Sequence, residues 1–339
     1  MSSPSIDHPV RVPLEARTDR TFNYRAFAGG AAVTLAYLAL VLVIRAWPDR
    51  ADSDIDYSGD LAAVFAAAAA AFAFVTLAGQ RFASIGARLR HAAPWLVVLA
   101  VLFAAWEIVT AKFGLLPMPF FPPPQAILGV LIDDWPRLGI GALSSLKLLV
   151  GGYLVGAAAG FTIGVAIGWS RAAAYWIHPV LRFVGPLPAT AWLPLAFFIF
   201  PSSLSASTFL IALATGFPVA VLTWSGVAGV SGSYYDVART LGASQRFLVF
   251  KVAIPAAMPQ VFVGLFMGLG NSFAVLVVAE MLGVKSGLGW YLQWAQGWAA
   301  YANMYTALFI MAIVCSALIT LLFRLRDRFL SWQKGLLRW

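Results

Sequence analysis

Long apolar runs, separated by short polar segments, make up most of the chain. A helix needs about 20 apolar residues to cross the hydrocarbon core of a bilayer, and eight runs approach or exceed that length. This pattern predicts an all-α polytopic membrane protein with about eight transmembrane helices. The predicted spans are 27–47, 61–78, 94–113, 144–168, 186–200, 205–230, 259–283 and 303–323.

Composition agrees with a membrane protein and excludes an ordinary soluble domain. Of the 339 residues, 61% are hydrophobic and only 11% are charged, whereas soluble domains are about 25% charged. The net charge of +9 does not indicate nucleic acid, because the basic residues are scattered through short loops and form no stripe. Cys315 is the single cysteine and lies in an apolar run, so we expect neither an internal disulfide nor a metal site. The expected surroundings are the lipid bilayer.

The positions of lysine and arginine predict the orientation, because cytoplasmic loops are enriched in both residues. With the N-terminus placed in the cytoplasm, most of the 23 basic residues fall on the cytoplasmic side. Residues 1–26 lack an apolar core, so we interpret them as a cytoplasmic tail and not as a signal peptide. We therefore predict a multi-pass protein with both termini in the cytoplasm.

The spans differ in character, which suggests a division of the chain. The run at 61–78 is rich in alanine and carries no strongly polar group that could line a pathway. We interpret the first two spans as an accessory hairpin. The predicted segments are 1–26 (cytoplasmic tail), 27–93 (accessory N-terminal transmembrane hairpin), 94–143 (first core helix and outer proline-rich loop), 144–323 (core, including the cytoplasmic loop 231–258) and 324–339 (cytoplasmic C-terminal tail).

Glycine and proline mark two helices of the core. Between Gly152 and Gly168 a glycine recurs at every fourth position, which lets a neighbouring helix approach closely. We interpret this stripe as packing within one subunit, with a dimer seam as the alternative. Pro186, Pro188 and Pro194 break the span 186–200, and broken helices are tolerated where protein or a water-filled cavity covers the backbone. We therefore place this span beside a transport path.

The polar segment 231–258 interrupts the apolar second half of the chain. Ser233 and Asp236 have the spacing of a capping box, and Gly242 is suited to ending the short helix that would follow. Ser244 can cap a second helix, 245–253, that ends before Pro255. We predict two helices joined by a turn, parallel to the cytoplasmic membrane surface, with an interfacial loop that binds no partner as the alternative.

Within this segment, Asp236-Val237-Ala238 followed by Gly242, and then Val252-Ala253-Ile254-Pro255, resembles the signature of permease subunits of ATP-binding-cassette (ABC) importers. The family pattern has Glu, Ala, Ile and Leu where this chain has Asp236, Val237, Val252 and Ile254. The stretches VARTLGAS, IPAAMPQVFVGL and VVAEMLGVKSGLGWYL are similar to the nitrate, sulfonate and taurine branch. The resemblance covers about 144–339.

The resemblance implies the fold and the partners of a binding-protein-dependent transport inner-membrane component. The fold would be that of a type I ABC importer permease, in the bacterial inner membrane. The partners would be two copies of an ATPase, which bind ATP and Mg, a second permease subunit in a homodimer, and a periplasmic solute-binding protein. The chain itself would bind no cofactor and catalyse no reaction, and it has no phosphate-binding loop. The residues implied in ATPase coupling are Tyr235, Asp236, Val237, Ala238, Arg239, Leu241, Gly242, Ala243, Ile254 and Pro255.

The solute path is predicted from polar residues inside spans. The acids in spans are Glu107, which we interpret as a packing contact or an interfacial group, and Glu280, either a structural hydrogen-bonding group or a path residue. The basic residues in spans lie near their ends, so an oxyanion would be recognised by dipoles, hydroxyls and helix ends. Candidate path residues are Thr190, Trp192, Asn271, Ser272 and Glu280.

The resulting hypothesis is an ATP-driven importer permease that moves a small anion such as nitrate, a sulfonate or taurine by alternating access. The alternatives are a secondary transporter, which would need inverted repeats and intramembrane proton carriers, and a membrane assembly subunit that transports nothing. An intramembrane enzyme is disfavoured, because His8, His91 and His178 have no catalytic partners nearby in the sequence.

Overall fold

The computed structural model describes residues 24–49, 57–81 and 83–333, and none of these lies in a β-strand. Seven of its helices are long and apolar enough to cross a membrane, or eight if one bent pair of segments is counted as a span. The predicted all-α polytopic fold with about eight spans is confirmed. The predicted N-terminal tail up to residue 23, and residues 334–339 of the C-terminal tail, lie outside the described residues.

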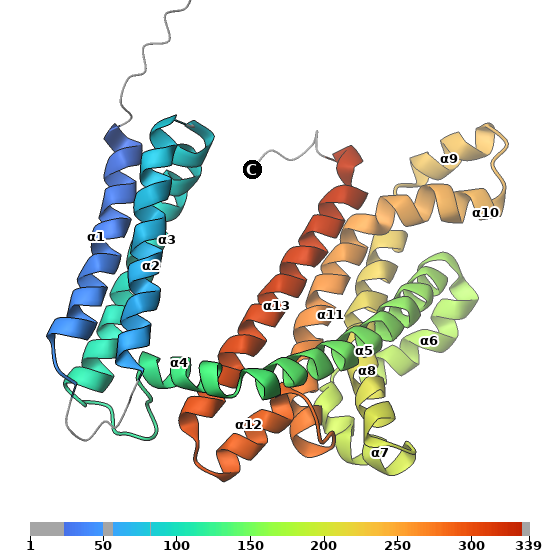
Figure 1. Ribbon diagram of the computed structural model, residues 1–339. Coiled ribbons are helices and arrows are strands. Elements are labelled where there is room, and N and C mark those ends of the chain that lie inside the picture. The colour runs from blue at the N-terminus through green and yellow to red at the C-terminus, as the bar shows by residue number, and fades with distance from the viewer. Residues whose placement is uncertain (1–23, 50–56, 82, 334–339) are drawn as a thin grey trace, which may run out of the picture. The chain divides into compact units, whose positions relative to one another are not determined.

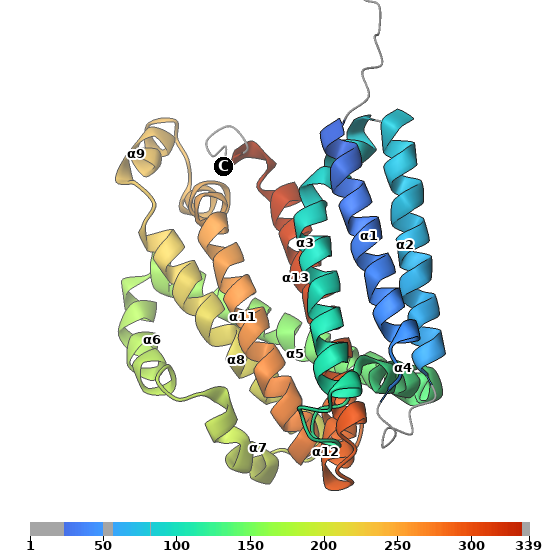
Figure 2. The same cartoon turned by 90° about the vertical axis from the view of Figure 1, so that its left-hand side faces the viewer.

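The chain divides into two units, of which the first ends at Leu115. Its helices are α1 (Tyr24–Ala46), α2 (Ser58–Arg81) and α3 (Ala83–Glu107), and a π-helical turn, Ile108–Lys112, extends α3. The three helices run side by side (Figure 2). On α1, Tyr37 packs between two aromatic rings of α2, Phe65 and Phe72, at centroid distances of 6.0 and 5.1 Å. The structure thus groups α3 with the first two helices, and the division at residue 93 into accessory hairpin and core stays a prediction.

Lys112 lies near the end of its predicted span, where the structure surrounds its ammonium group with polar partners. Its side chain is buried and its ammonium donates to the carbonyl oxygens of Ile44 and Trp47. It forms ion pairs with Asp49 and, at 3.5 Å, with Glu107. The π-helical turn directs Lys112 inward toward these groups. A sequence pattern read with the α-helical period of 3.6 does not predict this direction. Glu107 is therefore part of a buried packing contact, as we interpreted it.

The second unit, from Leu116 to Trp339, centres on three crossing helices, α5, α8 and α11 (Figure 1). A short helix, α4, precedes them, and α12 and α13 follow them along the chain. The bounds are α4 Pro124–Asp133, α5 Trp135–Trp169, α8 Ser203–Ala228, α11 Ile254–Leu282, α12 Leu288–Gly297 and α13 Tyr301–Phe329.

The glycine stripe of α5 packs against α8 within the same subunit. A Cβ atom at Gly156 would overlap the backbone of Ala212, and one at Gly160 would overlap the backbone of Gly216. The stripe therefore lets two backbones approach at distances that any side chain would prevent. The interpretation of the stripe as packing within one subunit is confirmed.

The predicted span 186–200 is the second half of a broken segment that begins earlier. Helix α6 (Arg171–Val184) occupies most of the stretch that we predicted as a cytoplasmic loop. After a turn, a 3₁₀ turn η2 (Ala189–Trp192) leads into α7 (Leu193–Ile199), and the two halves are bent by 87°. The prolines after Val184 prevent a continuous helix, as predicted. The sequence did not predict the apolar face of α6, because its basic residues resemble those of a loop.

The helix that begins after Ser244 continues through Pro255, so its predicted end there is wrong. Gln245–Phe247 (α10), a π-helical segment η3 (Leu248–Ala253) and α11 form one helical stretch from Gln245 to Leu282. A proline lacks the N–H of a regular helix and crowds the carbonyl four residues earlier. The wider π-helical turn before Pro255 relieves both problems.

Candidate functional site

The short helix α9 (Gly232–Thr240) lies at one end of α11, and α12 lies at the other end (Figures 1 and 2). The capping box that we predicted from Ser233 and Asp236 does not form in the first turn of α9. The N-cap is Ser231, whose hydroxyl bonds the hydroxyl of Ser233 and not the backbone. Asp236 instead pairs with Arg239 at 3.3 Å on the exposed surface. The aspartate side chain is one methylene shorter than the usual glutamate, and the cation one turn away offers it a nearer partner.

Gly242 ends α9 as predicted. It adopts a φ of +79°, a conformation that side chains with a Cβ atom rarely take. The N–H of Ala243 donates to the oxygen of Ala238 at 3.0 Å, and the N–H of Gly242 donates to that of Arg239 at 2.9 Å. This pair of bonds is a Schellman motif, which satisfies the last carbonyl groups of the helix. Ser244 then caps α10, as predicted, by accepting a bond from the N–H of Phe247.

The two faces of α9 have different surroundings. On the inner face, the ring of Tyr235 packs edge-on against Trp169 at the end of α5, with centroids 5.8 Å apart. Burial raises the pKa of the Tyr235 hydroxyl, and the charge of Arg239 lowers it by a smaller amount. On the outer face, Tyr234, Val237 and Leu241 expose 64%, 62% and 83% of their surface. The segment is anchored on one side and presents an apolar stripe on the other.

The remaining candidate coupling residues occupy two positions. Ala238 and Ala243 are half-buried at the end of α9 and in the turn. Ile254 and Pro255 are half-buried in the first turn of α11 and thus belong to the helix and not to the turn. The structure does not test their predicted roles in ATPase coupling, which stay predictions.

Two of the five candidate path residues lie together in a cavity. Thr190, from the broken segment, and Asn271, from α11, line a space of about 380 Å³. Its other walls come from α8, including Ala214 and Pro218, and from the turn after α6. The broken segment therefore lies against a cavity, in agreement with the reason for expecting its backbone to be covered.

The other three candidates lie elsewhere. Ser272 is fully buried, donates to the oxygen of Gly268 at 2.6 Å and shares a hydrogen bond with Thr215 of α8. Trp192 packs against the buried core beside α8. Glu280 lies at the end of α11 nearest α12, where its Oε2 accepts hydrogen bonds from the hydroxyl of Ser145 at 2.9 Å and the N–H of Gly289 at 2.8 Å. This geometry is that of a structural hydrogen-bonding group.

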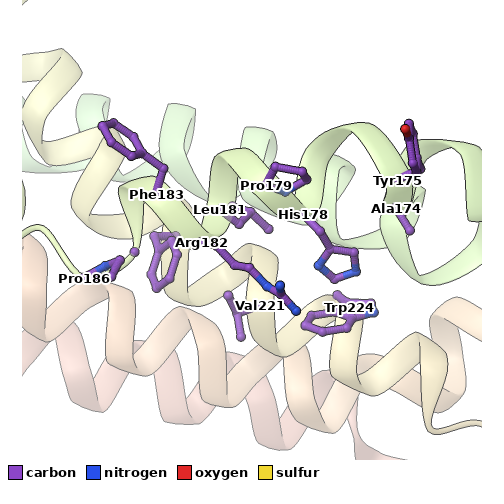
Figure 3. A pocket seen from close by; sticks show the side chains of 12 residues that line it. Ala174, Tyr175, His178, Pro179, Leu181, Arg182, Phe183, Pro186, Val221 and Trp224 are labelled. Atoms are coloured by element: carbon purple, nitrogen blue, oxygen red, sulfur yellow. The ribbon is translucent and has the colours of Figure 1, made fainter.

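A second and larger cavity contains residues that the sequence analysis did not select. It measures about 1180 Å³ and lies between α6 and α8 (Figure 3). His178 and Arg182 of α6 and Trp224 of α8 line it. The sequence contained a signal for this helix face. Ser170 is a residue type that caps helices, and His178 and Arg182 are four positions apart, so they share one face of the helix that Ser170 begins. Within residues 24–49, 57–81 and 83–333, no group of His, Cys, Asp and Glu could hold a metal ion.

Comparison with known proteins places this arrangement in a family. Residues 152–333 match the family described as binding-protein-dependent transport system inner membrane component. The chain is 26% identical to the nitrate import permease protein NrtB of Synechococcus elongatus over 258 residues, which cover 72% of this chain and 89% of that protein.

Two further relatives extend the comparison. A probable ABC transporter permease protein of Brucella abortus is 30% identical over 255 residues, covering 74% of this chain and 99% of that protein. The putative aliphatic sulfonates transport permease protein SsuC of Bacillus subtilis is 29% identical over 243 residues, covering 71% and 87%. The chain belongs to the binding-protein-dependent transport system inner membrane components, and it is a multi-pass permease subunit of an ABC importer.

Proposed function

We propose that this permease carries a small oxyanion, of the nitrate or sulfonate class, into the cytoplasm and is driven by a separate ATPase through α9. The observation that carries the proposal is the exposed apolar stripe of α9. This helix is joined to α8 and α11, which form walls of the cavity that holds Thr190 and Asn271. The substrate class is supported by relatives that are named for nitrate import and for aliphatic sulfonate transport.

The exposed face of α9 supports a docked protein partner. The proposed orientation puts α9 outside the bilayer, so lipid tails would not cover its apolar stripe. An ATPase groove would take up Leu241 and Ala238, and the pair Asp236–Arg239 would form the polar rim. Gly242 would set the angle at which the stripe is presented.

The connections of α9 provide a route for mechanical coupling. Only residues 229–231 separate it from α8, and α10 with η3 joins it to α11 as one helical stretch. Both α8 and α11 form walls of the cavity that holds Thr190 and Asn271. When ATP closes two ATPase subunits, two copies of α9 in a permease homodimer would move together. That movement would exchange outward-facing and inward-facing states.

The distribution of charge in the second unit supports the proposed orientation in the inner membrane. Figure 1 shows α9 and α12 at opposite ends of this unit, and more basic residues belong to the elements at the α9 end than to those at the α12 end. By the positive-inside rule, the α9 end is cytoplasmic and the α12 end faces the periplasmic binding protein. The residues at the α9 end are Arg171, Arg239, Arg246, Lys251, Arg324, Arg326 and Arg328, and those at the other end are Arg137 and Lys285.

The coupling role is tested by placing a charge on the exposed stripe. Leu241→Arg should abolish co-purification with the ATPase and uptake by reconstituted vesicles, because a cation cannot enter an apolar groove. Leu204→Arg is the matched control: Leu204 is 59% exposed at the opposite end of α8, and its variant should keep the ATPase. A Leu241→Arg complex with normal ATPase content and uptake would show that α9 is not the coupling element.

A further inference from the structure

The lining of the cavity between α6 and α8 includes the guanidinium of Arg182 and the imidazole of His178 (Figure 3). His178 and Arg182 are four residues apart on α6, so both project from the same face of the helix. In Figure 3 the side chain of Arg182 extends toward the ring of His178 and the indole of Trp224. The rings of His178 and Trp224 pack edge-on with centroids 4.3 Å apart, which holds the imidazole against the indole.

No negative charge balances Arg182 within the part of the chain that the structure describes. No carboxylate in residues 24–49, 57–81 and 83–333 forms an ion pair with it, and the residues that line the cavity include no aspartate or glutamate. Guanidinium offers five N–H donors and stays charged in proteins. An arginine on a membrane-embedded helix needs water or a counter-ion around its charge, so this cavity can supply solvent or an anion.

The basic cavity adjoins the cavity that holds Thr190 and Asn271. Both are lined by Gly185, Pro186 and Phe217, so they meet at these residues. A Cβ atom at Gly185 would overlap the ring of Phe217, which marks a narrow contact between α6 and α8. A solute in the Thr190 cavity therefore has the guanidinium of Arg182 in the adjoining space.

The position of this cavity along the bundle is on the side of α9. Helix α6 starts next to Trp169, the residue against which Tyr235 of α9 packs. At a rise of 1.5 Å per residue, Arg182 lies about 16 Å along α6 from Arg171, near the middle of a hydrocarbon core about 30 Å thick, and its side chain extends from there toward Trp224 (Figure 3). Trp224 lies in the last turns of α8, also toward α9. With the proposed orientation, this is the cytoplasmic half of the path.

We propose that Arg182 and His178 form an oxyanion-binding subsite on the cytoplasmic half of the path, through which the solute leaves. This inference rests on the proposed function and adds the groups that recognise the substrate. A guanidinium binds two oxygens of a nitrate or sulfonate group side by side, and the imidazole can donate to the third. Under this proposal, recognition inside the permease uses a fixed positive charge in addition to the dipoles, hydroxyls and helix ends expected from the sequence.

The first experiment removes the charge in the assembled complex. The permease, its ATPase and its binding protein are reconstituted in vesicles, and uptake of nitrate and of ethanesulfonate is measured separately. Arg182→Gln should lower uptake of the transported anion by about tenfold to a hundredfold, because charge-assisted hydrogen bonds are lost. Arg182→Lys should retain an intermediate rate. Arg171→Gln, on the same helix but outside the cavity lining, is the matched control and should leave uptake unchanged.

The second experiment restores the charge and so separates recognition from folding. The background is Cys315→Ala, which removes the single native cysteine, with partner subunits that lack cysteine. Arg182→Cys is labelled in detergent before reconstitution, either with a reagent that adds an aminoethyl cation or with one that adds a sulfonatoethyl anion. The cation should restore uptake at least fivefold over the unlabelled variant, and the anion should not.

The outcomes distinguish this inference from the function on which it rests. If the wild-type complex assembles and imports an oxyanion while Arg182→Gln imports it at the same rate, the subsite is overturned and the proposed function stands. If complete cationic labelling restores nothing, the charge is not the group required and the subsite is again overturned. If the wild-type complex imports only a neutral or cationic solute, both the substrate class and the subsite are wrong.

Discussion

The hydroxyl of Ser145 donates a hydrogen bond of 2.9 Å to Oε2 of Glu280 and accepts one of 2.8 Å from the N–H of Leu288. These bonds join α5, the end of α11 and the start of α12. The same carboxylate oxygen accepts from the N–H of Gly289 at 2.8 Å. A Cβ atom at Gly287, whose φ is +102°, would overlap the carboxylate. The turn between α11 and α12 is therefore shaped around one buried acid.

Replacing Ser145 with alanine should destabilise the second unit, because two buried groups lose a partner. We expect Ser145→Ala to lower the free energy of unfolding by about 1–3 kcal/mol. Ser144→Ala is the neighbouring control and should change it by less than about 0.5 kcal/mol. Thermal unfolding of the purified protein in detergent measures both, and equal stability of the two variants would contradict a structural role for this network.

The contact between α5 and α8 can be tested with two glycines of the same helix. Gly156→Ala forces a methyl group into the backbone of Ala212 and should cost about 1–3 kcal/mol of stability. A Cβ atom at Gly151 meets nothing within 4 Å, so Gly151→Ala should be neutral or stabilising by up to about 1 kcal/mol. The midpoints of unfolding in denaturing detergent compare the two variants. The reverse order would show that the two backbones are not in close contact.

A second glycine pair tests the turn after α9. Gly242→Ala must keep a φ of +79°, which should lower the stability of the turn by about 1–2 kcal/mol. Gly232→Ala is the control, because residue 232 begins α9 without a positive φ and with space for a Cβ atom. Hydrogen–deuterium exchange in residues 232–245 should accelerate about fivefold to thirtyfold for the first variant and stay unchanged for the second. Unchanged exchange in Gly242→Ala would mean that alanine adopts the turn without strain.

In the first unit, Lys112 should be essential for stability because it is the cation paired with buried Glu107. Lys112→Met should destabilise by roughly 3–5 kcal/mol, since Asp49 and the buried Glu107 each lose an ion pair with Lys112. Adding Glu107→Gln should recover part of that loss. Lys147→Met, at an exposed position of α5, is the control and should have little effect. If the double variant Lys112→Met/Glu107→Gln melts at no higher temperature than Lys112→Met, the pairing of Lys112 with Glu107 is contradicted.

The all-α fold and the turn that ends α9 were predictable because they depend on local patterns. Apolar length predicted the spans, and the caps at Gly242 and Ser244 follow from the conformations of those two residue types. The continuation through Pro255 was not predictable, since a π-helical turn leaves no composition signal. The pairing of Asp236 was also missed, because two partners compete for one short side chain.

The sequence predicted the residues that line the cavity only in part. Thr190 and Asn271 meet in one cavity, whereas Ser272, the next residue, turns into the contact with Thr215. Successive residues on a helix are about 100° apart, so neighbours in sequence have different surroundings. Which of them faces a cavity depends on how the helices pack.

Whereas the structure decided that the glycine stripe of α5 packs against α8, the sequence by itself determined the class of protein, the approximate spans and the short polar helix with its glycine turn. These properties are local, because they follow from apolar length, period and backbone preference. Only the tertiary structure decided that Arg182 lies on a broken span beside His178 and Trp224, and that Glu280 holds a turn. Such relationships join segments far apart in the chain, and only the packing of α6 against α8 and of α5 against α11 brings them together.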